Sequence, residues 1–139
     1  MKMIAEREDV WVASLEDKPG ALSQKLGALA EAGADLDFII ARRSVEKPGT
    51  GALFVTPLRG DREVRTAARL GFLVSSHLHA VRVEGLNEPG IGAKLTQRIA
   101  KEGINLRGFS GAVFGTRFVM HLAFDSTEDA QKAITILQQ

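Results

Sequence analysis

The spacing of apolar and polar residues changes in the same order in each half of the 139-residue chain. Residues 10–15, "VWVASL", and 80–86, "AVRVEGL", alternate β-branched with other residues, which is typical of strands with one buried face. Apolar positions three or four residues apart follow in each half and predict a helix. A strand, a hairpin, a third strand and a second helix complete the pattern. The same sequence of elements is therefore predicted twice.

The remaining elements have matching segments in the two halves. They are the second strands "ADLDFIIARRS" and "INLRGFSGAVF", the third strands "GALFVTPL" and "TRFVMHLAF", and the second helices "GDREVRTAARL" and "STEDAQKAITIL". Ser126 or Thr127 is the expected N-cap of the last helix, with acidic residues in its first turn. The first-half hairpin loop is about four residues longer. "GFLVSSH" predicts a fourth strand in the first half, whereas the second half has no counterpart.

The order βαββαβ is that of the ferredoxin-like fold. The sequence therefore predicts an α+β protein of two such units, residues 8–76 and 77–139, with antiparallel sheets and helices on one face. The second unit lacks its C-terminal strand. One candidate for the vacant edge is the N-terminal "MKMIAE"; a strand from a partner chain and an uncovered edge are equal alternatives.

Shifting the sequence against itself by 70 positions aligns residues at the Pro-Gly corners and around the helix ends of the two halves, as an internal duplication would. The aligned pairs are Asp17 with Asn87, Pro19 with Pro89, Gly20 with Gly90, Ala30 with Ala100, Gly33 with Gly103, Asp35 with Asn105, and Leu36 with Leu106. Gly33 and Gly103 follow the first helix of each half. Glycine takes the left-handed conformation of a helix C-terminus without a Cβ penalty, so both are expected to end a helix.

Both halves pass from strand to helix through a Pro-Gly corner, "DKPGAL" and "NEPGIG". Proline suits the first helical turn, and Asp17 or Asn87 just before it can cap the helix. The glycine leaves the backbone amides of 20–22 and of 90–92 open, and such amides bind carboxylate or phosphate. A single Pro-Gly corner is most simply a tight turn. Two copies in register favour a binding site.

The side chains around the two corners differ in charge. If the first two strands of a unit are neighbours, Asn87 and Asn105 flank the second corner with neutral amides, which both donate and accept hydrogen bonds. Asp17 and Asp35 occupy the same positions in the first half, where they attract an ammonium group but repel a carboxylate. The second half is therefore the predicted binder of a zwitterion.

Composition argues against several classes of function. The formal net charge is +1, with 18 basic and 17 acidic residues, which gives no electrostatic reason to expect binding to nucleic acid or to an anionic membrane. There is no cysteine, which excludes disulfides and thiolate chemistry. No signal peptide and no run of about 18 apolar residues occurs. A cytoplasmic protein is the simplest expectation.

Other motifs lack the residues that their chemistry needs. "GLNEPGIGAKLT" has Ile91 where a phosphate loop requires lysine, and no dinucleotide fingerprint follows. "GTRFVMHLAF" lacks the aromatic spacing of an RNA-recognition module. His77 and His79 share a strand face, but no third ligand is near them, so no metal site is expected. His121 has no evident serine or acidic partner. No catalytic group can be assembled, and no cofactor is predicted.

The βαββαβ order, the two corners and the helix ends "EAGADL" and "KEGINL" together resemble the ACT domain, a small regulatory module of amino-acid biosynthetic enzymes. The resemblance covers both halves and is stronger in the second; as a whole the chain resembles stand-alone tandem ACT proteins. It implies amino-acid binding between two units whose sheets join side by side. By this resemblance the ligand-binding residues are Asn87, Pro89, Gly90, Ile91, Asn105 and Leu106, with first-half equivalents Asp17, Pro19, Gly20, Ala21, Asp35 and Leu36.

The predicted function is a non-catalytic regulatory protein that binds an amino acid and forms a homodimer. The alternative is a structural or adaptor module that keeps the fold for oligomerisation and docks, with empty corners, on an enzyme or transporter. A partner enzyme fits either function. Arg42, Arg43 and Arg107 are expected to be solvated strand positions, although Arg107, close to Asn105, can reach a ligand carboxylate.

Overall fold

A computed structural model describes residues 3–75 and 78–139 of the chain. The chain divides into two compact units. Residues 9–75 form the first unit. Residues 78–139 form the second unit together with the N-terminal residues 3–8. The second unit is therefore built from two separate stretches of the sequence.

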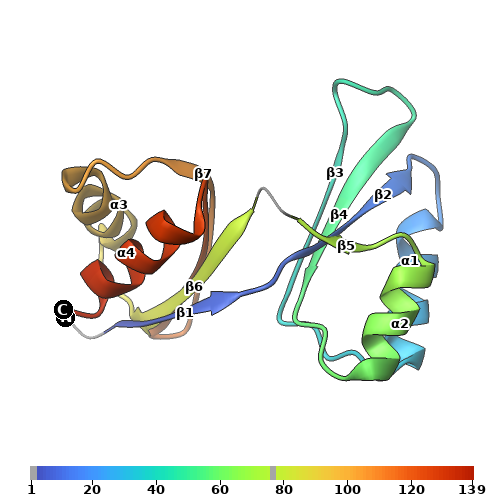
Figure 1. The fold of residues 1–139 in the computed structure, drawn as a ribbon, viewed down its shortest axis with the longest axis horizontal. Helices are drawn as coiled ribbons and strands as arrows, with labels where there is room; N and C mark the ends of the chain where they lie inside the picture. Colours follow the sequence, from blue (N-terminus) through green and yellow to red (C-terminus); the bar gives the residue numbers. More distant parts are fainter. Residues whose placement is uncertain (1–2, 76–77) are drawn as a thin grey trace. The chain divides into compact units, whose positions relative to one another are not determined.

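The first unit is a four-stranded antiparallel sheet with two helices. Its elements are β2 (Trp11–Glu16), α1 (Ala21–Glu31), β3 (Phe38–Arg43), β4 (Thr50–Thr56), α2 (Asp61–Arg69) and β5 (Leu73–Val74). The strand order is β3-β4-β2-β5, so the first strand of the unit lies between the third and the fourth. Figure 1 shows α1 and α2 on the same side of this sheet. This is the ferredoxin-like arrangement that the sequence predicted.

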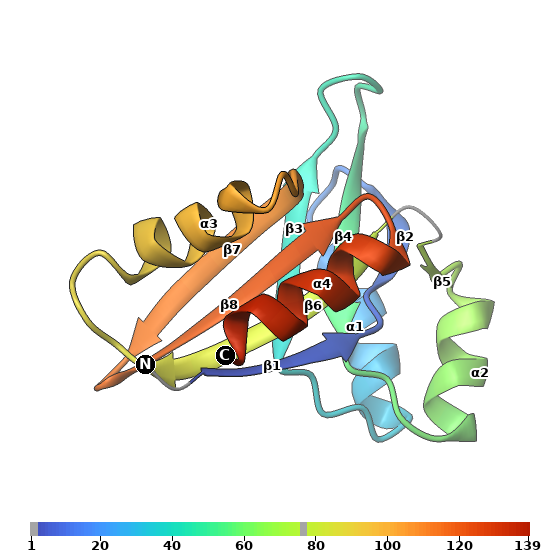
Figure 2. The same cartoon turned by 60° about the vertical axis from the view of Figure 1, so that its left-hand side comes forward.

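The second unit repeats this architecture with a strand taken from the start of the chain. It contains β6 (His79–Leu86), α3 (Ile91–Lys101), β7 (Leu106–Phe114), β8 (Arg117–Phe124), α4 (Thr127–Leu137) and β1 (Met3–Glu8). The order is β1-β6-β8-β7, and β1 pairs antiparallel to β6 from Met3 opposite Gly85 to Glu8 opposite Ala80. Figure 2 shows β1 running along β6. The chain's own N-terminal segment thus fills the vacant edge, and no strand follows α4 in the described part of the chain.

The donated strand takes part in the core of the second unit. Met3 and Ala5 are 7% and 4% exposed and pack in one cluster with Val81 and Val83 of β6. The alternate residues of β1 point to the other face of the sheet, since successive side chains of a strand alternate. The first unit has a separate core, formed around Leu29, Leu53, Val55, Ala67 and Phe72.

The helix ends follow the predicted glycines. Gly33 and Gly103 have φ angles of 95° and 73°. After α1, the amide of Ala34 donates to the carbonyl of Leu29 at 3.0 Å, and that of Gly33 donates to Ala30 at 3.0 Å. This is a Schellman motif, which requires a left-handed residue. α4 begins as predicted, because the Ser126 hydroxyl accepts a hydrogen bond from the Asp129 amide at 3.1 Å.

The two hairpins differ in length as the alignment predicted. Residues 44–49 join β3 to β4, whereas Gly115 and Thr116 alone join β7 to β8. Gly115 has a φ of 59° in this tight turn. The α+β prediction of two ferredoxin-like units with antiparallel sheets and helices on one face is confirmed.

Candidate functional site

Each Pro-Gly corner is a β-turn that precedes its helix. The amide of Ile91 donates to the carbonyl of Glu88 at 3.1 Å, and Gly90 has φ 82° and ψ 10°. In the first unit the amide of Ala21 donates to Lys18 at 3.3 Å, and Gly20 has φ 88° and ψ −14°. Proline at the second position and a residue with positive φ at the third position are characteristic of a type II turn. The glycines are therefore required by the backbone.

This geometry corrects the predicted capping. The helices begin at Ala21 and Ile91, so each proline lies outside the first helical turn, and the N-cap is Gly20 or Gly90. Neither helix has a side-chain cap, so the prediction that Asp17 or Asn87 caps is wrong. The turn also uses the amide of Ile91, one of those expected to be open. The amides of Gly92 and Ala93 remain in a first turn, where a helix offers no acceptor.

An ion pair joins the first corner to the edge strand. Arg43 of β3 lies 2.9 Å from the Asp17 carboxylate, and its side chain is 82% exposed, which agrees with the predicted solvated strand position. Lys18 lies 2.7 Å from Glu16. The hydrogen bond and charge of Lys18 lower the pKa of Glu16, and Glu16 raises the pKa of Lys18 in the same way. Opposite charges already occupy this corner.

The second corner is neutral. The backbone N–H of Asn87 donates to the Thr116 carbonyl at 2.8 Å, as the backbone N–H of Asp17 donates to the Gly49 carbonyl in the first unit. The Asn87 side chain is exposed and has no hydrogen-bond partner in the described part of the chain. Val113 stands in β7 at the position of Arg43, so a corresponding ion pair is absent here. The two corners share a backbone and differ in charge.

Asn105 does not flank the second corner. β8 lies between β6 and β7, so the first two strands of the unit are not neighbours. Leu106 lies opposite Phe124, which lies opposite His79, so β7 starts where β6 starts. Asn87 follows the other end of β6. The prediction that the two asparagines meet within one unit is wrong, and Asp35 is separated from Asp17 in the same way.

The remaining predicted residues divide between core and surface. Pro19, Gly20, Pro89 and Gly90 are exposed, whereas Ala21 and Ile91 are buried. Leu36 and Leu106 pack against the cores of their units. Arg107 lies 3.4 Å from Asp125 across the hairpin, and its side chain is 48% exposed.

Apolar side chains of β7 and β8 lie beside the start of α3. A methyl group on Gly92 would lie 3.8 Å from Met120 Cε and 3.9 Å from Phe109 Cζ. Phe109 is 45% exposed and Val113 is 53% exposed on the edge strand β7. Sequence reasoning missed these residues. The alternation within "GFSGAVF" was the available signal, because it places Phe109, Gly111 and Val113 on one strand face.

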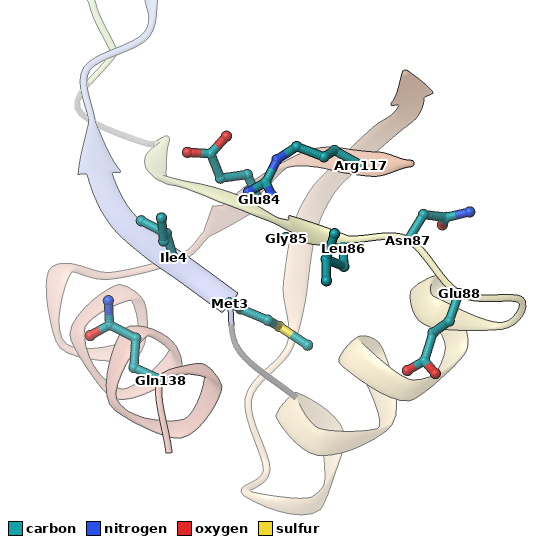
Figure 3. Close-up of a pocket in the computed structure, with 9 residues that line it drawn as sticks. All are labelled: Met3, Ile4, Glu84, Gly85, Leu86, Asn87, Glu88, Arg117 and Gln138. Carbon is teal, nitrogen blue, oxygen red and sulfur yellow. The ribbon is translucent and has the colours of Figure 1, made fainter. Parts of the chain in front are cut away.

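A pocket of about 820 Å³ lies on the second unit beside Asn87 (Figure 3). Residues from the start of β1, the end of β6, the start of β8 and the segment after α4 line it. They are Met3, Ile4, Glu84, Gly85, Leu86, Asn87, Glu88, Arg117 and Gln138. Of the predicted ligand-binding residues, only Asn87 is in this lining. The pocket is therefore distinct from the apolar side chains beside Gly92.

The histidines do not form a metal site in the described part of the chain, where no group of three potential ligands lies together. His121 Nδ1 lies 2.6 Å from Glu8 Oε2, so this strand histidine has an acidic partner that is not evident from the sequence. His79 Nδ1 lies 3.2 Å from the Thr127 hydroxyl. His77 lies outside the described residues.

No helix among the described residues is long and apolar enough to cross a membrane.

The fold matches proteins of known structure along almost its whole length. A protein from Bacteroides thetaiotaomicron gives a TM-score of 0.78 at 17% identity, over 94% of this chain and 88% of that one. The regulatory subunit of aspartate kinase from Thermus thermophilus, in its ligand-free form, gives 0.66 at 19%, over 99% and 95%.

A structure of aspartokinase alpha and beta subunits gives a TM-score of 0.67 at 22% identity, over 99% of this chain and 95% of that one. The fold is thus a tandem ACT-like fold, similar to that of aspartate kinase regulatory subunits. No protein-family model matches the chain, and no curated protein matches its sequence. Similarity at these identities concerns the fold.

Proposed function

We propose that this protein is a non-catalytic regulatory protein that binds an amino acid at the second Pro-Gly corner. The observation that carries the proposal is the contrast in charge: the Asn87 side chain is neutral and has no partner among the described residues, whereas Asp17 is paired with Arg43. The similarity of the fold to aspartate kinase regulatory subunits supports a regulatory role. A partner enzyme and a cytoplasmic location belong to the same proposal.

The corner offers complementary groups to an amino acid. The amides of Gly92 and Ala93 lie at the positive end of the α3 dipole and favour a carboxylate. The Asn87 amide oxygen can accept from the ammonium group. Phe109 and Met120, which lie beside Gly92, would contact an apolar ligand side chain. Charge-assisted hydrogen bonds contribute about 1.5–3 kcal/mol each, which suits a small metabolite sensed at micromolar to millimolar concentration.

The proposed site includes residues from two copies of the chain. β7 is an edge strand that exposes Phe109, Val113 and Phe114 by 45%, 53% and 67%. Edge strands readily pair with another chain. Antiparallel pairing of two β7 strands about a twofold axis would place the start of one strand beside the end of the other. Asn105 of a second copy would then reach the end of the sheet that holds Asn87, which one unit alone does not allow.

Thermal unfolding with each of the twenty amino acids tests ligand binding. An amino acid at about 100 times its dissociation constant should stabilise the protein by about 2.7 kcal/mol. Gly90→Val should abolish the shift, because the side chain would cover the first-turn amides. Gly20→Val is the matched control, since both glycines have φ above 80° and no atom within 4 Å of an added Cβ. A shift retained in Gly90→Val and lost in Gly20→Val would place the site in the first unit.

Mixing two variants tests the shared site. Asn87→Ala and Asn105→Ala should each weaken binding when pure. A mixed dimer of the two variants has one site with both asparagines and one site with neither. Mixing should therefore restore full affinity at one of the two sites of each mixed dimer. If binding is not restored by exchange of subunits, the two residues do not share a site. Sedimentation of the parent protein measures whether the dimer exists.

Exposed apolar residues on β7 also favour the alternative function, an oligomerisation module with empty corners. The same experiments separate the two functions. A dimer that responds to none of the amino acids at millimolar concentration would support the module and exclude the sensor.

A further inference from the structure

The lining of the pocket beside Asn87 includes Arg117, which has no ion-pair or hydrogen-bond partner among the described residues. Three charged residues line it: Glu84, Glu88 and Arg117. Arg82 contacts Glu84 with both terminal nitrogens, at 3.3 and 3.5 Å, and Lys94 lies 3.2 Å from Glu88. In the described part of the chain Arg117 has neither an ion pair nor a hydrogen bond. Each lining acid thus has a basic partner, and among the described residues Arg117 is the lining charge left unpaired.

Two apolar side chains belong to the same lining as Arg117. Leu86 is directly opposite Arg117 in the sheet, and Ile4 is opposite Glu84. Ile4 and Leu86 alternate with buried neighbours, so both lie on the sheet face away from the core of the unit. They are 50% and 64% exposed. Figure 3 shows the Glu84 and Arg117 side chains extending over the same stretch of β6.

Two amide side chains add hydrogen-bonding groups to the lining. Gln138 donates from Nε2 to the Ala5 carbonyl at 2.9 Å, which fixes its position and leaves its oxygen and second N–H available. The Asn87 side chain is unpartnered among the described residues. Ligand sites typically combine an apolar lining with a few polar groups that orient the ligand.

We propose that this pocket binds a small carboxylic acid with a short aliphatic chain. The carboxylate lies on Arg117, whose planar guanidinium forms two parallel hydrogen bonds to such a group. The aliphatic chain covers Ile4 and Leu86. A single unpaired cation suits one carboxylate rather than a polyanion, and the exposed apolar residues suit a chain rather than a free inorganic ion. The pocket shares Asn87 with the proposed amino-acid site but is otherwise different from it, because Gly90, Gly92 and Phe109 do not line it.

A series of straight-chain acids from propanoate to hexanoate, titrated into the full chain, provides the test. The side-chain amide signals of Asn87 and Gln138 in ¹H–¹⁵N NMR spectra report binding at the pocket. Affinity should rise about three- to fourfold for each added methylene that is buried. Hexylammonium, with the same chain and the opposite charge, should not bind. Equal binding of hexanoate and hexylammonium, or no shift of these signals with hexanoate, would overturn the proposal.

Two variants separate the contributions of charge and chain. Arg117→Gln should weaken every acid by about ten- to a hundredfold, since it removes a charge-assisted contact. Leu86→Ala should reduce the gain per methylene and affect propanoate little. Arg107→Gln is the matched control, an exposed arginine on β7 of the same sheet that is outside the lining. Unchanged binding in Arg117→Gln, or an equal loss in Arg107→Gln, contradicts the assignment.

The same variants show which proposal fails. Gly90→Val should abolish the response to an amino acid and leave hexanoate binding unchanged. Arg117→Gln should do the reverse. Loss of both responses in either variant would contradict two separate sites.

Discussion

The two Pro-Gly corners have the same backbone and different side chains. Both form a turn with glycine at positive φ before the helix, and in both the residue at 17 or 87 donates its amide to the neighbouring hairpin. Arg43 and Asp17 form an ion pair in the first unit, whereas the second unit has Val113 and Asn87 at these positions. The Pro-Gly pair is thus a requirement of the fold. The chemistry of each corner depends on the side chains around it.

The two units also differ in the origin of the strand beside their first strand. In the first unit this strand is β5, which has two residues and follows α2 directly. In the second unit it is the six-residue β1 from the other end of the sequence. β1 contributes two buried side chains, Met3 and Ala5, whereas both residues of β5 are exposed. The second unit therefore depends more on this strand.

The largest expected effect comes from a charge on this strand. Ala5→Asp places an unpaired carboxylate in the core of the second unit, where Ala5 is 4% exposed, and should destabilise it by about 3–5 kcal/mol. Leu73→Asp on β5 is the control; Leu73 is 70% exposed, so its effect should stay within about 0.5 kcal/mol. Urea unfolding measures both. Equal effects would contradict the difference between the two strands.

Charge at the second corner should have an intermediate effect. Asn87→Asp places a negative charge near the proposed ligand carboxylate. The repulsion is about 1 kcal/mol at 4 Å in water, which is about a fivefold weaker affinity. Calorimetric titration with the amino acid found in the thermal screen measures it. Asn87→Ala, which removes the amide without adding charge, is the comparison; the charge argument fails if Ala weakens binding as much as Asp.

Removing the ion pair of the first corner should change stability little. The Asp17 and Arg43 side chains are 36% and 82% exposed, and exposed pairs contribute about 0–1 kcal/mol. Asp17→Asn should therefore lower the free energy of unfolding by less than about 1 kcal/mol, and high salt should remove the difference. Urea unfolding at two salt concentrations tests this. A salt-independent loss above about 2 kcal/mol would show that Asp17 has another structural role.

The smallest effect concerns Glu16 and Lys18. Lys18→Gln should raise the pKa of Glu16 toward its ordinary value, because the hydrogen bond and charge that lower it are lost. A lowered carboxyl pKa in the folded protein favours the fold above the ordinary pKa and ceases to do so as the pH falls through the folded value. Both groups are fully exposed, so we expect a change in titration without a measurable change in stability. A ¹³C NMR titration of the Glu16 carboxyl group measures it, and an unchanged pKa would contradict the pairing.

The elements could be predicted from the sequence because each depends on local signals. Gly33 and Gly103 end helices through positive φ, and Ser126 caps α4 through its own hydroxyl. The sequence alone leaves the position of β1 open, since its pairing with β6 depends on residues about eighty positions away. The alternation of Met3 and Ala5 with polar neighbours is compatible with any sheet edge.

The site was less predictable. The place of Asp17 and Asn87 before a helix predicts that they cap it, but the type II turn makes glycine the N-cap. The prediction that Asn105 lies beside Asn87 requires consecutive strands to be neighbours, whereas the α3 crossover returns the chain to the starting end of the sheet. The Glu8 and His121 pair joins residues 113 positions apart, a separation that motif spacing does not report.

The insertion of the first unit between β1 and β6 has a consequence for the order of folding. During synthesis β1 leaves the ribosome before the whole first unit and before its partner β6, so the pairing of β1 with β6 cannot form until β6 has been made. Residues 9–75 contain all the strands of their own sheet and can fold in the meantime. In the folded unit Trp11 pairs with Val74, which holds the two ends of the insertion together. A long loop closure thereby becomes a short one, with a smaller entropic cost for the pairing of β1 with β6.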